Sequence, residues 1–228
     1  MGESARVTMQ RLEIGAERAP VLVVDDFAAE PERLVQRISG SRFLPQGAMF
    51  PGVRTRAPLS YRQLLLDFLK PLLPEFGLLP GTLSLQMAHY SLVSLPPEQL
   101  VFLQRIPHID SVAGNGLATV HYLFRGDWGG TAFYRHRKTG HEFIDSARRE
   151  AYFRCLEEES RGPDAPGPGY INGDTALFEQ IGRVDGVFNR LVVYRRNCLH
   201  SACIDNSRVP PPDPLAGRLS INGFVDVS

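Results

Sequence analysis

The sequence is poor in several features that would indicate a compartment or a partner. It has three cysteines, Cys155, Cys198 and Cys203, among 228 residues. So few cysteines, and an odd number, argue against a disulfide framework and predict a reducing compartment. The first fifteen residues lack the apolar segment of a secretory signal, and no apolar run is long enough to cross a bilayer. We therefore expect a cytoplasmic protein without a membrane partner.

An excess of charge of either sign is also missing. Lysine and arginine together number 25, as do aspartate and glutamate, so the formal net charge is zero. Nucleic-acid-binding proteins usually carry a basic excess, and we therefore expect no nucleic-acid partner. The length and the 43% of hydrophobic residues fit one large domain with a buried core.

The first part of the chain predicts mainly helices. A strand is expected at Val21–Val24, a helix from Pro31 to Gly40, a loop over residues 45–58, and a second helix at Tyr61–Leu69 that Pro71 and Pro74 end. We expect residues 1–82 to pack as an N-terminal strand and helices on the rest of the domain.

From Leu83 onward the pattern changes to short strands. These are expected at Leu83–Met87, Val101–Pro107, Leu117–Phe124, Thr131–Arg135, Arg190–Tyr194, Leu199–Ile204 and Leu219–Val225. Two helices, at 146–160 and Thr175–Ile181, flank the breaker-rich segment 161–169. The pattern predicts a mainly β fold with flanking helices, a jelly roll or barrel over residues 83–228 with a helical insertion at about 140–188.

Candidate metal ligands stand in the segment RIPHIDSVAGNG. His108 and Asp110 are two residues apart, so on a strand both side chains would point to one face. An H-x-D pair alone is a weak signal, because it is common by chance. His200 in NCLHSACI, within the late strands, offers a third ligand. Two imidazoles and one carboxylate leave open positions on a metal, as non-haem Fe(II) oxygenases require.

A candidate anion site follows in GRLSINGFV. Arg218 and Ser220 alternate onto one face of an expected strand. A guanidinium can hold a carboxylate through two parallel hydrogen bonds, and a nearby hydroxyl can add another. This pair would suit the distal carboxylate of a dicarboxylate co-substrate such as 2-oxoglutarate.

The order of motifs PHID, ATVHYLF, GGTAFY, NRLVVY, LHS and GRLS resembles the Fe(II)/2-oxoglutarate-dependent oxygenases, near their prolyl-hydroxylase-like branch. The resemblance covers about residues 83 to 226, and it implies a double-stranded β-helix, the cupin-like form of the jelly roll. The sequence is similar in particular to bacterial members of this superfamily that have a helical insertion before the strand of the distal histidine, here His200.

The resemblance also implies roles for single residues. His108, Asp110 and His200 would bind the iron, Arg218 and Ser220 would bind 2-oxoglutarate, and Tyr122 is expected to reach the same carboxylate. Fe(II), 2-oxoglutarate and O₂ would together hydroxylate or otherwise oxidise an unactivated C–H bond of a small molecule, an amino acid or a natural-product intermediate. The carboxylate of Asp110 favours oxidation over halogenation.

Other interpretations of the same segments remain open. Cys198 and Cys203 flank His200, which admits a cysteine nucleophile or a zinc site, although neither explains H-x-D or R-x-S. A jelly-roll module that binds metal or ligand without turnover is the non-enzymatic alternative. For the remaining candidates we expect His121 in the core or pocket wall, His136 and His141 in exposed turns, Arg54 and Arg56 in a solvated loop, and a substrate lid at 140–188.

Overall fold

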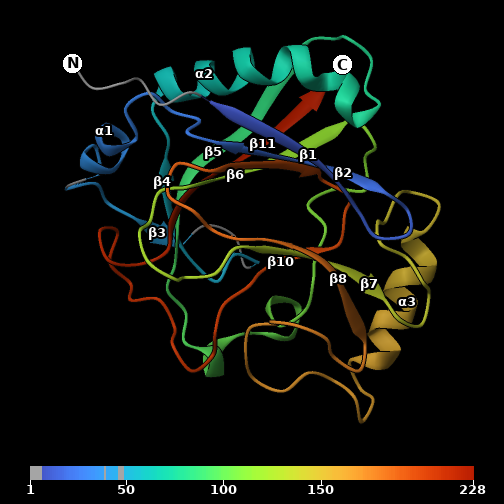
Figure 1. Cartoon of the computed structure of the whole chain (residues 1–228). Coiled ribbons are helices and arrows are strands. Elements are labelled where there is room, and N and C mark those ends of the chain that lie inside the picture. The colour runs from blue at the N-terminus through green and yellow to red at the C-terminus, as the bar shows by residue number, and fades with distance from the viewer. Residues whose placement is uncertain (1–6, 39, 46–48) are drawn as a thin grey trace.

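The computed structural model describes residues 7–38, 40–45 and 49–228, which form two antiparallel β-sheets that face each other between helices (Figure 1). The larger sheet has the strand order β1-β2-β9-β6-β11-β5-β4-β3, and the smaller one has the order β10-β7-β8. This is the predicted mainly β fold with flanking helices, a cupin-like jelly roll of the double-stranded β-helix type.

The elements have the following bounds. The larger sheet consists of β1 (Thr8–Ile14), β2 (Ala19–Asp25), β3 (Leu44–Pro45), β4 (Gly52–Arg56), β5 (Leu83–Val93), β6 (Gly116–Tyr122), β9 (Leu191–Arg195) and β11 (Leu219–Val227). The smaller sheet consists of β7 (Thr131–His136), β8 (Phe178–Val184) and β10 (His200–Ala202). The helices are α1 (Pro31–Gln36), α2 (Leu59–Leu69) and α3 (Arg149–Glu159), with 3-10 turns η1 (Lys70–Phe76), η2 (Pro97–Gln99) and η3 (Phe102–Gln104).

The outer face of the larger sheet is covered by α2 and η1 (Figure 1). Tyr61, Leu65 and Leu69 of α2 are buried against apolar residues of the sheet. Full burial of one such leucine stabilises the fold by roughly 2 kcal/mol. Truncating Leu65, which is 0% exposed, would leave a cavity and cost about 2–5 kcal/mol.

The inner face of the larger sheet meets the smaller sheet, and this is where polar residues gather. On β11, Leu219 and Ile221 pack toward α2. The alternation of a strand turns Arg218 and Asn222 to the opposite face, and both line the cavity between the sheets. β6 is buried along its whole length because it is covered on both faces.

Two sequence-based predictions about local structure after residue 83 are wrong. Residues 101–107 form η3 and a loop rather than a strand, because the apolar run has no neighbouring strand to pair with. Thr175–Ile181 is not a helix, since Phe178–Val184 forms β8, which pairs with β7. Leu177 and Ile181 are four residues apart, so the local pattern also fits a helix. Hydrogen bonding to β7 is what makes this segment a strand.

The first part of the chain also differs from its prediction. Part of the expected loop 45–58 is β4, which pairs with β5, while residues 46–48 lie outside the described residues. The second helix ends at Leu69 before Pro71 and Pro74, as predicted, but the chain continues as the 3-10 turn η1 until Gly77, whose φ is +64°. β1 was not predicted, and its pairing with β2 extends the larger sheet.

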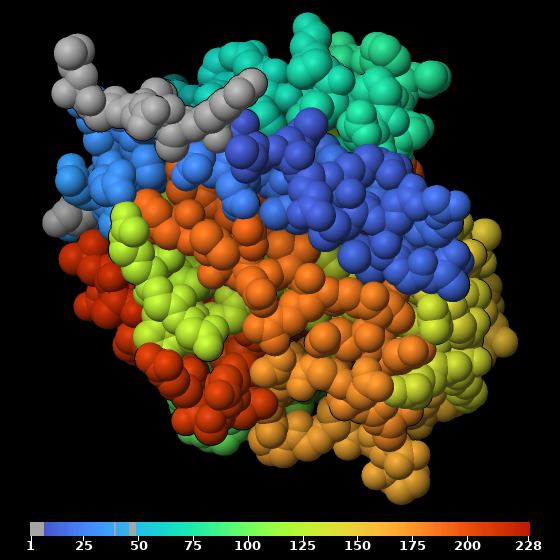
Figure 2. Space-filling view, in the orientation of Figure 1, coloured from blue at the N-terminus to red at the C-terminus, as the bar shows by residue number. Residues whose placement is uncertain are grey.

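The segment 140–188 contains α3 but also β8, so it is part of the smaller sheet as well as an insertion. Figure 2 shows the hairpin of β1 and β2, in dark blue, lying across the surface between α2, in teal, and the orange segments that include β9. No helix in the described part of the chain combines the length and apolar character needed to cross a membrane.

Candidate metal centre

The segment with His108 and Asp110 is an irregular loop held against the start of β10 and the connection that precedes it. The backbone N–H of His108 donates to the carbonyl of His200 at 2.9 Å, and the N–H of His200 donates back at 3.0 Å. The N–H of Asp110 donates to the carbonyl of Arg196 at 2.8 Å. These bonds bring the two parts of the chain together without the strand that the sequence predicted.

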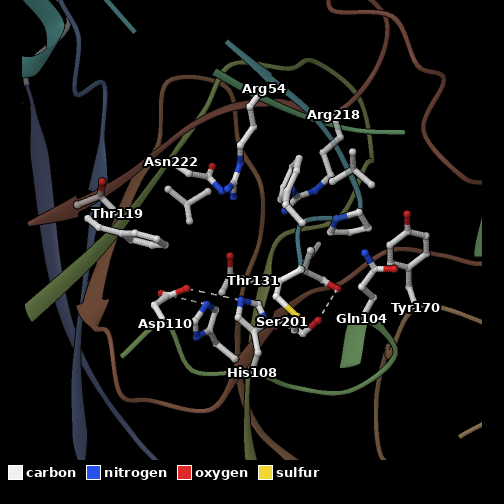
Figure 3. Close-up of a pocket in the computed structure, with 18 of the residues that line it drawn as sticks. Arg54, Gln104, His108, Asp110, Thr119, Thr131, Tyr170, Ser201, Arg218 and Asn222 are labelled. Atoms are coloured by element: carbon white, nitrogen blue, oxygen red, sulfur yellow. Dashed lines mark hydrogen bonds and ion pairs between the residues drawn. The ribbon is translucent and has the colours of Figure 1, made fainter. Parts of the chain in front are cut away.

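The side chains of His108, Asp110 and His200 converge, and one potential ligand atom from each lies within 4.8 Å of the others. The two carboxylate oxygens of Asp110 face one imidazole each. His108 Nε2 lies 3.7 Å from Oδ1, and His200 Nε2 lies 3.6 Å from Oδ2. Figure 3 shows Asp110 and His108 side by side at one end of the cavity.

The tautomer of His200 is set by its backbone neighbour. Its Nδ1 lies 2.9 Å from the carbonyl oxygen of Cys198, so Nδ1 carries the hydrogen and donates it. Nε2, 3.6 Å from Oδ2 of Asp110, is then unprotonated in the neutral ring, and its lone pair can bind a metal. A hydrogen bond of this kind on the far nitrogen is typical of metal-binding histidines.

The protonation states suit a metal ion. Burial lowers the pKa of His200 to about 4. Partial desolvation and the neighbouring His200 also lower the pKa of His108, whose side chain is 43% exposed. Both imidazoles are therefore neutral at pH 7. Burial also raises the pKa of Asp110, whose Oδ2 is buried without a hydrogen bond among the described residues. A divalent cation would satisfy this carboxylate, so the three residues fit a metal.

A cavity of about 100 Å³ opens next to these residues, between the two sheets. Its charged lining residues are Arg54, Asp110 and Arg218. Arg218 is 4% exposed and turned inward (Figure 3). Its Nε donates to the carbonyl of Trp128 at 3.1 Å and its Nη2 to that of Gly130 at 2.7 Å. One edge of the guanidinium is thereby fixed, and three of its five N–H groups remain for a ligand.

The sequence matches the model of one protein family. A model of a family of unknown function, DUF6445, matches residues 5–225. The chain belongs to the DUF6445 family. No curated protein matches it.

Several solved structures share a distant likeness with this DUF6445 protein. HygX from Streptomyces hygroscopicus, with nickel and 2-oxoglutarate bound, is 12% identical, with 91% of this chain and 83% of HygX covered at a TM-score of 0.49. SnoN, a non-heme alpha ketoglutarate dependent epimerase from nogalamycin biosynthesis, is 14% identical, with 92% and 78% covered at 0.44. AviO1 from Streptomyces viridochromogenes Tue57 is 14% identical, with 97% and 89% covered at 0.44.

Ser220 and Tyr122, the other two predicted cofactor-binding residues, each form a hydrogen bond with a residue that lines the cavity. Ser220 donates its hydroxyl hydrogen to Oδ1 of Asn222 at 2.7 Å, and Asn222 lines the cavity. The hydroxyl of Tyr122 lies 2.6 Å from that of Thr131, another lining residue. Both are almost fully buried. Each can orient a polar group that faces the cavity.

The position of Arg54 differs from the prediction. The sequence predicts a solvated loop, but Arg54 lies on β4, where its Nε donates to Ser91 Oγ at 3.1 Å and its guanidinium stacks on Phe50 at 3.9 Å. Burial lowers its pKa to about 10, although the nearby Asp110 opposes this. The alternation of GVRTR was the one available signal, and it is too short to define a strand without its partner β5.

Two histidines outside the metal site also have defined positions. His121 is fully buried in the core, as predicted, where it stacks on Tyr61 and bonds Asn189 at 3.1 Å. The prediction that His136 lies in an exposed turn is wrong. Its side chain is 0% exposed, and its Nε2 lies 2.7 Å from Glu159, which belongs to α3.

The cysteines do not join the metal site. The carbonyl of Cys198, rather than its thiol, contacts His200. Burial raises the pKa of Cys198 to about 12 and also raises that of Cys203, so neither thiol is an activated nucleophile. Within the described residues, the cluster around His200 that could hold a metal contains no cysteine.

Proposed function

We propose that this protein is a non-haem Fe(II)- and 2-oxoglutarate-dependent oxygenase that acts on a small organic molecule. One observation carries the proposal: His108, Asp110 and His200 converge at a cavity that also contains the buried guanidinium of Arg218. Two imidazoles and one carboxylate are the ligand set of non-haem Fe(II) oxygenases, and an arginine suits a dicarboxylate co-substrate. Hydroxylation is the proposed outcome, and the prolyl-hydroxylase-like branch stays a prediction.

The three ligand residues would hold the ion from one side. Fe(II), 2-oxoglutarate and O₂ together supply the oxidising chemistry when bound, at the expense of 2-oxoglutarate, which leaves as succinate and CO₂. The neutral imidazoles of His108 and His200 donate lone pairs, and the ionised Asp110 supplies charge. Three protein ligands leave coordination positions for the co-substrates.

Arg218 would hold the distal carboxylate of 2-oxoglutarate. The carbonyls of Trp128 and Gly130 fix the direction of its guanidinium before any ligand binds. Preorganised donors of this kind bind without the cost of ordering a flexible side chain. Asn222, oriented by Ser220, and Thr131, oriented by Tyr122, add polar groups to the same wall.

The proposal is tested by supplying Fe(II), 2-oxoglutarate and O₂ to the whole protein and measuring succinate. We expect succinate to form slowly without a primary substrate and faster with one. Asp110→Asn should abolish formation, since it removes a charged ligand. Asp164→Asn is the matched control, because Asp164 is exposed and lies away from the cavity.

Binding separates the possible outcomes. If wild-type protein binds Fe(II) and 2-oxoglutarate but forms no succinate with any candidate substrate, the non-catalytic binding module is the better description. If neither binds, the proposal is wrong.

A further inference from the structure

The charges that line the cavity do not balance once the proposed ligands are bound. Arg54, Arg218 and Asp110 are the charged residues of the lining, and no ion pair within 4 Å joins either arginine to a carboxylate among the described residues. Two guanidinium groups and a ferrous ion carry four positive charges. Asp110 and the 2-oxoglutarate dianion carry three negative charges, so one positive charge remains.

Arg54 is the residue whose charge is left over. It comes from β4, whereas Arg218 lies directly before β11, and Figure 3 shows both reaching into the cavity from the side opposite His108. Asp110 is the one carboxylate among the described lining residues, and it lies near Arg54 but would serve the metal. If Arg218 holds the co-substrate, Arg54 therefore has no anionic partner of its own. Burying an unpaired cation is costly. An anionic ligand that pairs with the guanidinium of Arg54 would offset this cost.

The side chain of Arg54 is held in place for this role. Ser91 accepts a hydrogen bond from its Nε, the ring of Phe50 lies under the guanidinium, and Met87 Sδ makes a weak contact with Nη1 at 3.8 Å. None of these partners carries a charge. Its Nη2 has no hydrogen-bond partner in the part of the chain that the structure describes, and it can donate to a ligand.

Part of the lining is apolar. Met49 and Leu103 line the cavity and are 48% and 42% exposed, and the ring of Phe50, another lining residue, stacks on the guanidinium of Arg54. An apolar surface next to one cation suits a molecule with a single anionic group on a hydrophobic body. A phosphate monoester would bring about two negative charges at pH 7, more than the one that remains.

We propose that Arg54 is the specificity-determining residue of this site and that the primary substrate is a small monocarboxylate with an apolar portion. The proposal rests on the proposed function, because it assigns Arg218 to 2-oxoglutarate. A guanidinium with an unused edge is the preferred partner of a carboxylate. Binding of the acid at Arg54 would leave the apolar portion against Met49, Phe50 and Leu103.

The test compares acids with their own primary amides. Wild-type protein is saturated with Zn(II), which is redox-inert, and with 2-oxoglutarate, so that Arg218 is occupied. Phenylacetate, hexanoate and N-acetylglycine are then each compared with the corresponding amide by ligand-observed NMR. We expect at least one acid to bind at least tenfold more tightly than its amide, since a buried charged pair is worth that much or more.

Two variants test whether Arg54 causes the preference for the acid over its amide. Arg54→Gln should remove this preference, so that the affinities for acid and amide differ by no more than about twofold, while the affinity for 2-oxoglutarate falls less than tenfold. Arg56→Gln is the matched control, because Arg56 lies on the same strand, is exposed and does not line the cavity. It should keep the preference for the acid.

Three results would overturn the proposal: wild-type protein that prefers no acid, a preference that survives in Arg54→Gln, or a loss of 2-oxoglutarate affinity of tenfold or more in that variant. The last result would place Arg54 in the co-substrate site. If wild-type protein binds neither Zn(II) nor 2-oxoglutarate, the proposed function fails. The same comparison in metal-free protein then decides the role of Arg54 alone.

Discussion

Two charged side chains in the cavity, Arg218 and Asp110, have no ion pair with an arginine, lysine or carboxylate within 4 Å among the described residues. Arg218 donates to two backbone carbonyls, which orient it but do not neutralise it. Asp110 has a buried oxygen without a hydrogen bond among the described residues. Groups of this kind are costly to bury unless a ligand completes them, which is why both are informative about binding.

The role of Arg218 leads to a prediction about co-substrate affinity. Arg218→Gln removes the charge that would face the distal carboxylate, so 2-oxoglutarate affinity should fall at least tenfold, equivalent to about 1.4 kcal/mol. Isothermal titration with Zn(II)-loaded protein measures it. Arg183→Gln, at an exposed arginine paired with Asp185, should leave the affinity unchanged. Equal affinities in the two variants would exclude Arg218 as the anchor.

His121 leads to a prediction about stability and pH. Burial lowers its pKa to about 4, whereas an unfolded chain has a histidine pKa of about 6.5. Between these values the unfolded state binds more protons, so the free energy of unfolding should decrease as pH falls from about 6.5 to about 4. His121→Phe removes this group, which packs against Phe27, Tyr61 and Asn189.

Urea unfolding at several pH values measures the effect. His108 and His200 titrate in both proteins, so the difference between them isolates His121. The slope of the unfolding free energy against pH should be smaller in the variant by about one proton. Identical slopes would mean that His121 is protonated as easily in the folded protein as in the unfolded one.

The ligand residues could be proposed from the sequence because H-x-D, a late histidine and R-x-S are local patterns with a definite chemistry. Arg54 could not be placed in this way. Nothing local distinguishes it from Arg56, and its position depends on pairing between β4 and β5 and on contact with Ser91 and Phe50. The pairing of distant segments determines which residues line a cavity, and a single sequence does not reveal that pairing.

At the scale of elements, the turn before β7 positions Arg218, the proposed anchor of 2-oxoglutarate. Gly129 has a φ of +73°, and a Cβ there would overlap the carbonyl oxygen of Cys203. Because glycine has no Cβ, the chain can pass close to Cys203 and present the carbonyls of Trp128 and Gly130 to Arg218. The turn DWGG is thus part of the proposed co-substrate site.

Replacing Gly129 should therefore affect both stability and binding. Gly129→Ala adds a strained backbone, costing about 1–2 kcal/mol, and displaces the carbonyls that hold Arg218. Gly140→Ala is the matched control, since Gly140 has a φ of +71° and nothing within 4 Å of an added Cβ. We expect thermal unfolding to show lower stability in both variants and titration to show weaker 2-oxoglutarate binding in Gly129→Ala alone. Normal binding in that variant would contradict the role of the turn.

Elements with strong local signals were predicted correctly. α2 and α3 have apolar residues at helical spacing, and β6 and β11 are rich in apolar residues. The missed strand β1 is mostly exposed, so it has little apolar pattern to reveal it. The apolar residues of β8 are spaced in a way that fits both a helix and a strand. In each case a hydrogen-bonded neighbour, rather than the segment itself, determines the structure.

At the scale of the whole molecule, Glu142 joins the N-terminal hairpin to the segment before α3. It is 3% exposed and accepts hydrogen bonds from the backbone N–H groups of Ala16 and Glu17, both at 2.9 Å, and from Arg135. In Figure 2 the dark-blue hairpin meets the yellow-green segment at this edge. The contact links residues about 125 positions apart, so the sequence could not predict it.

Glu142→Gln should lower the free energy of unfolding by about 2–3 kcal/mol, because it removes a buried charge from three donors. Glu179→Gln is the control, since Glu179 binds the same Arg135 but is 39% exposed, and it should cost less than about 1 kcal/mol. Chemical denaturation measures both. Equal losses would mean that Glu142 has no special role in joining the two segments.

The central claim is that the side chains of His108, Asp110 and His200 hold a single divalent metal ion. Titration of the whole protein with Co(II), followed by its absorption spectrum, tests it directly. The account predicts one bound ion per chain, with affinity reduced at least about a hundredfold in His200→Ala and unchanged in His141→Ala. Binding of equal strength in wild-type protein and His200→Ala would contradict it.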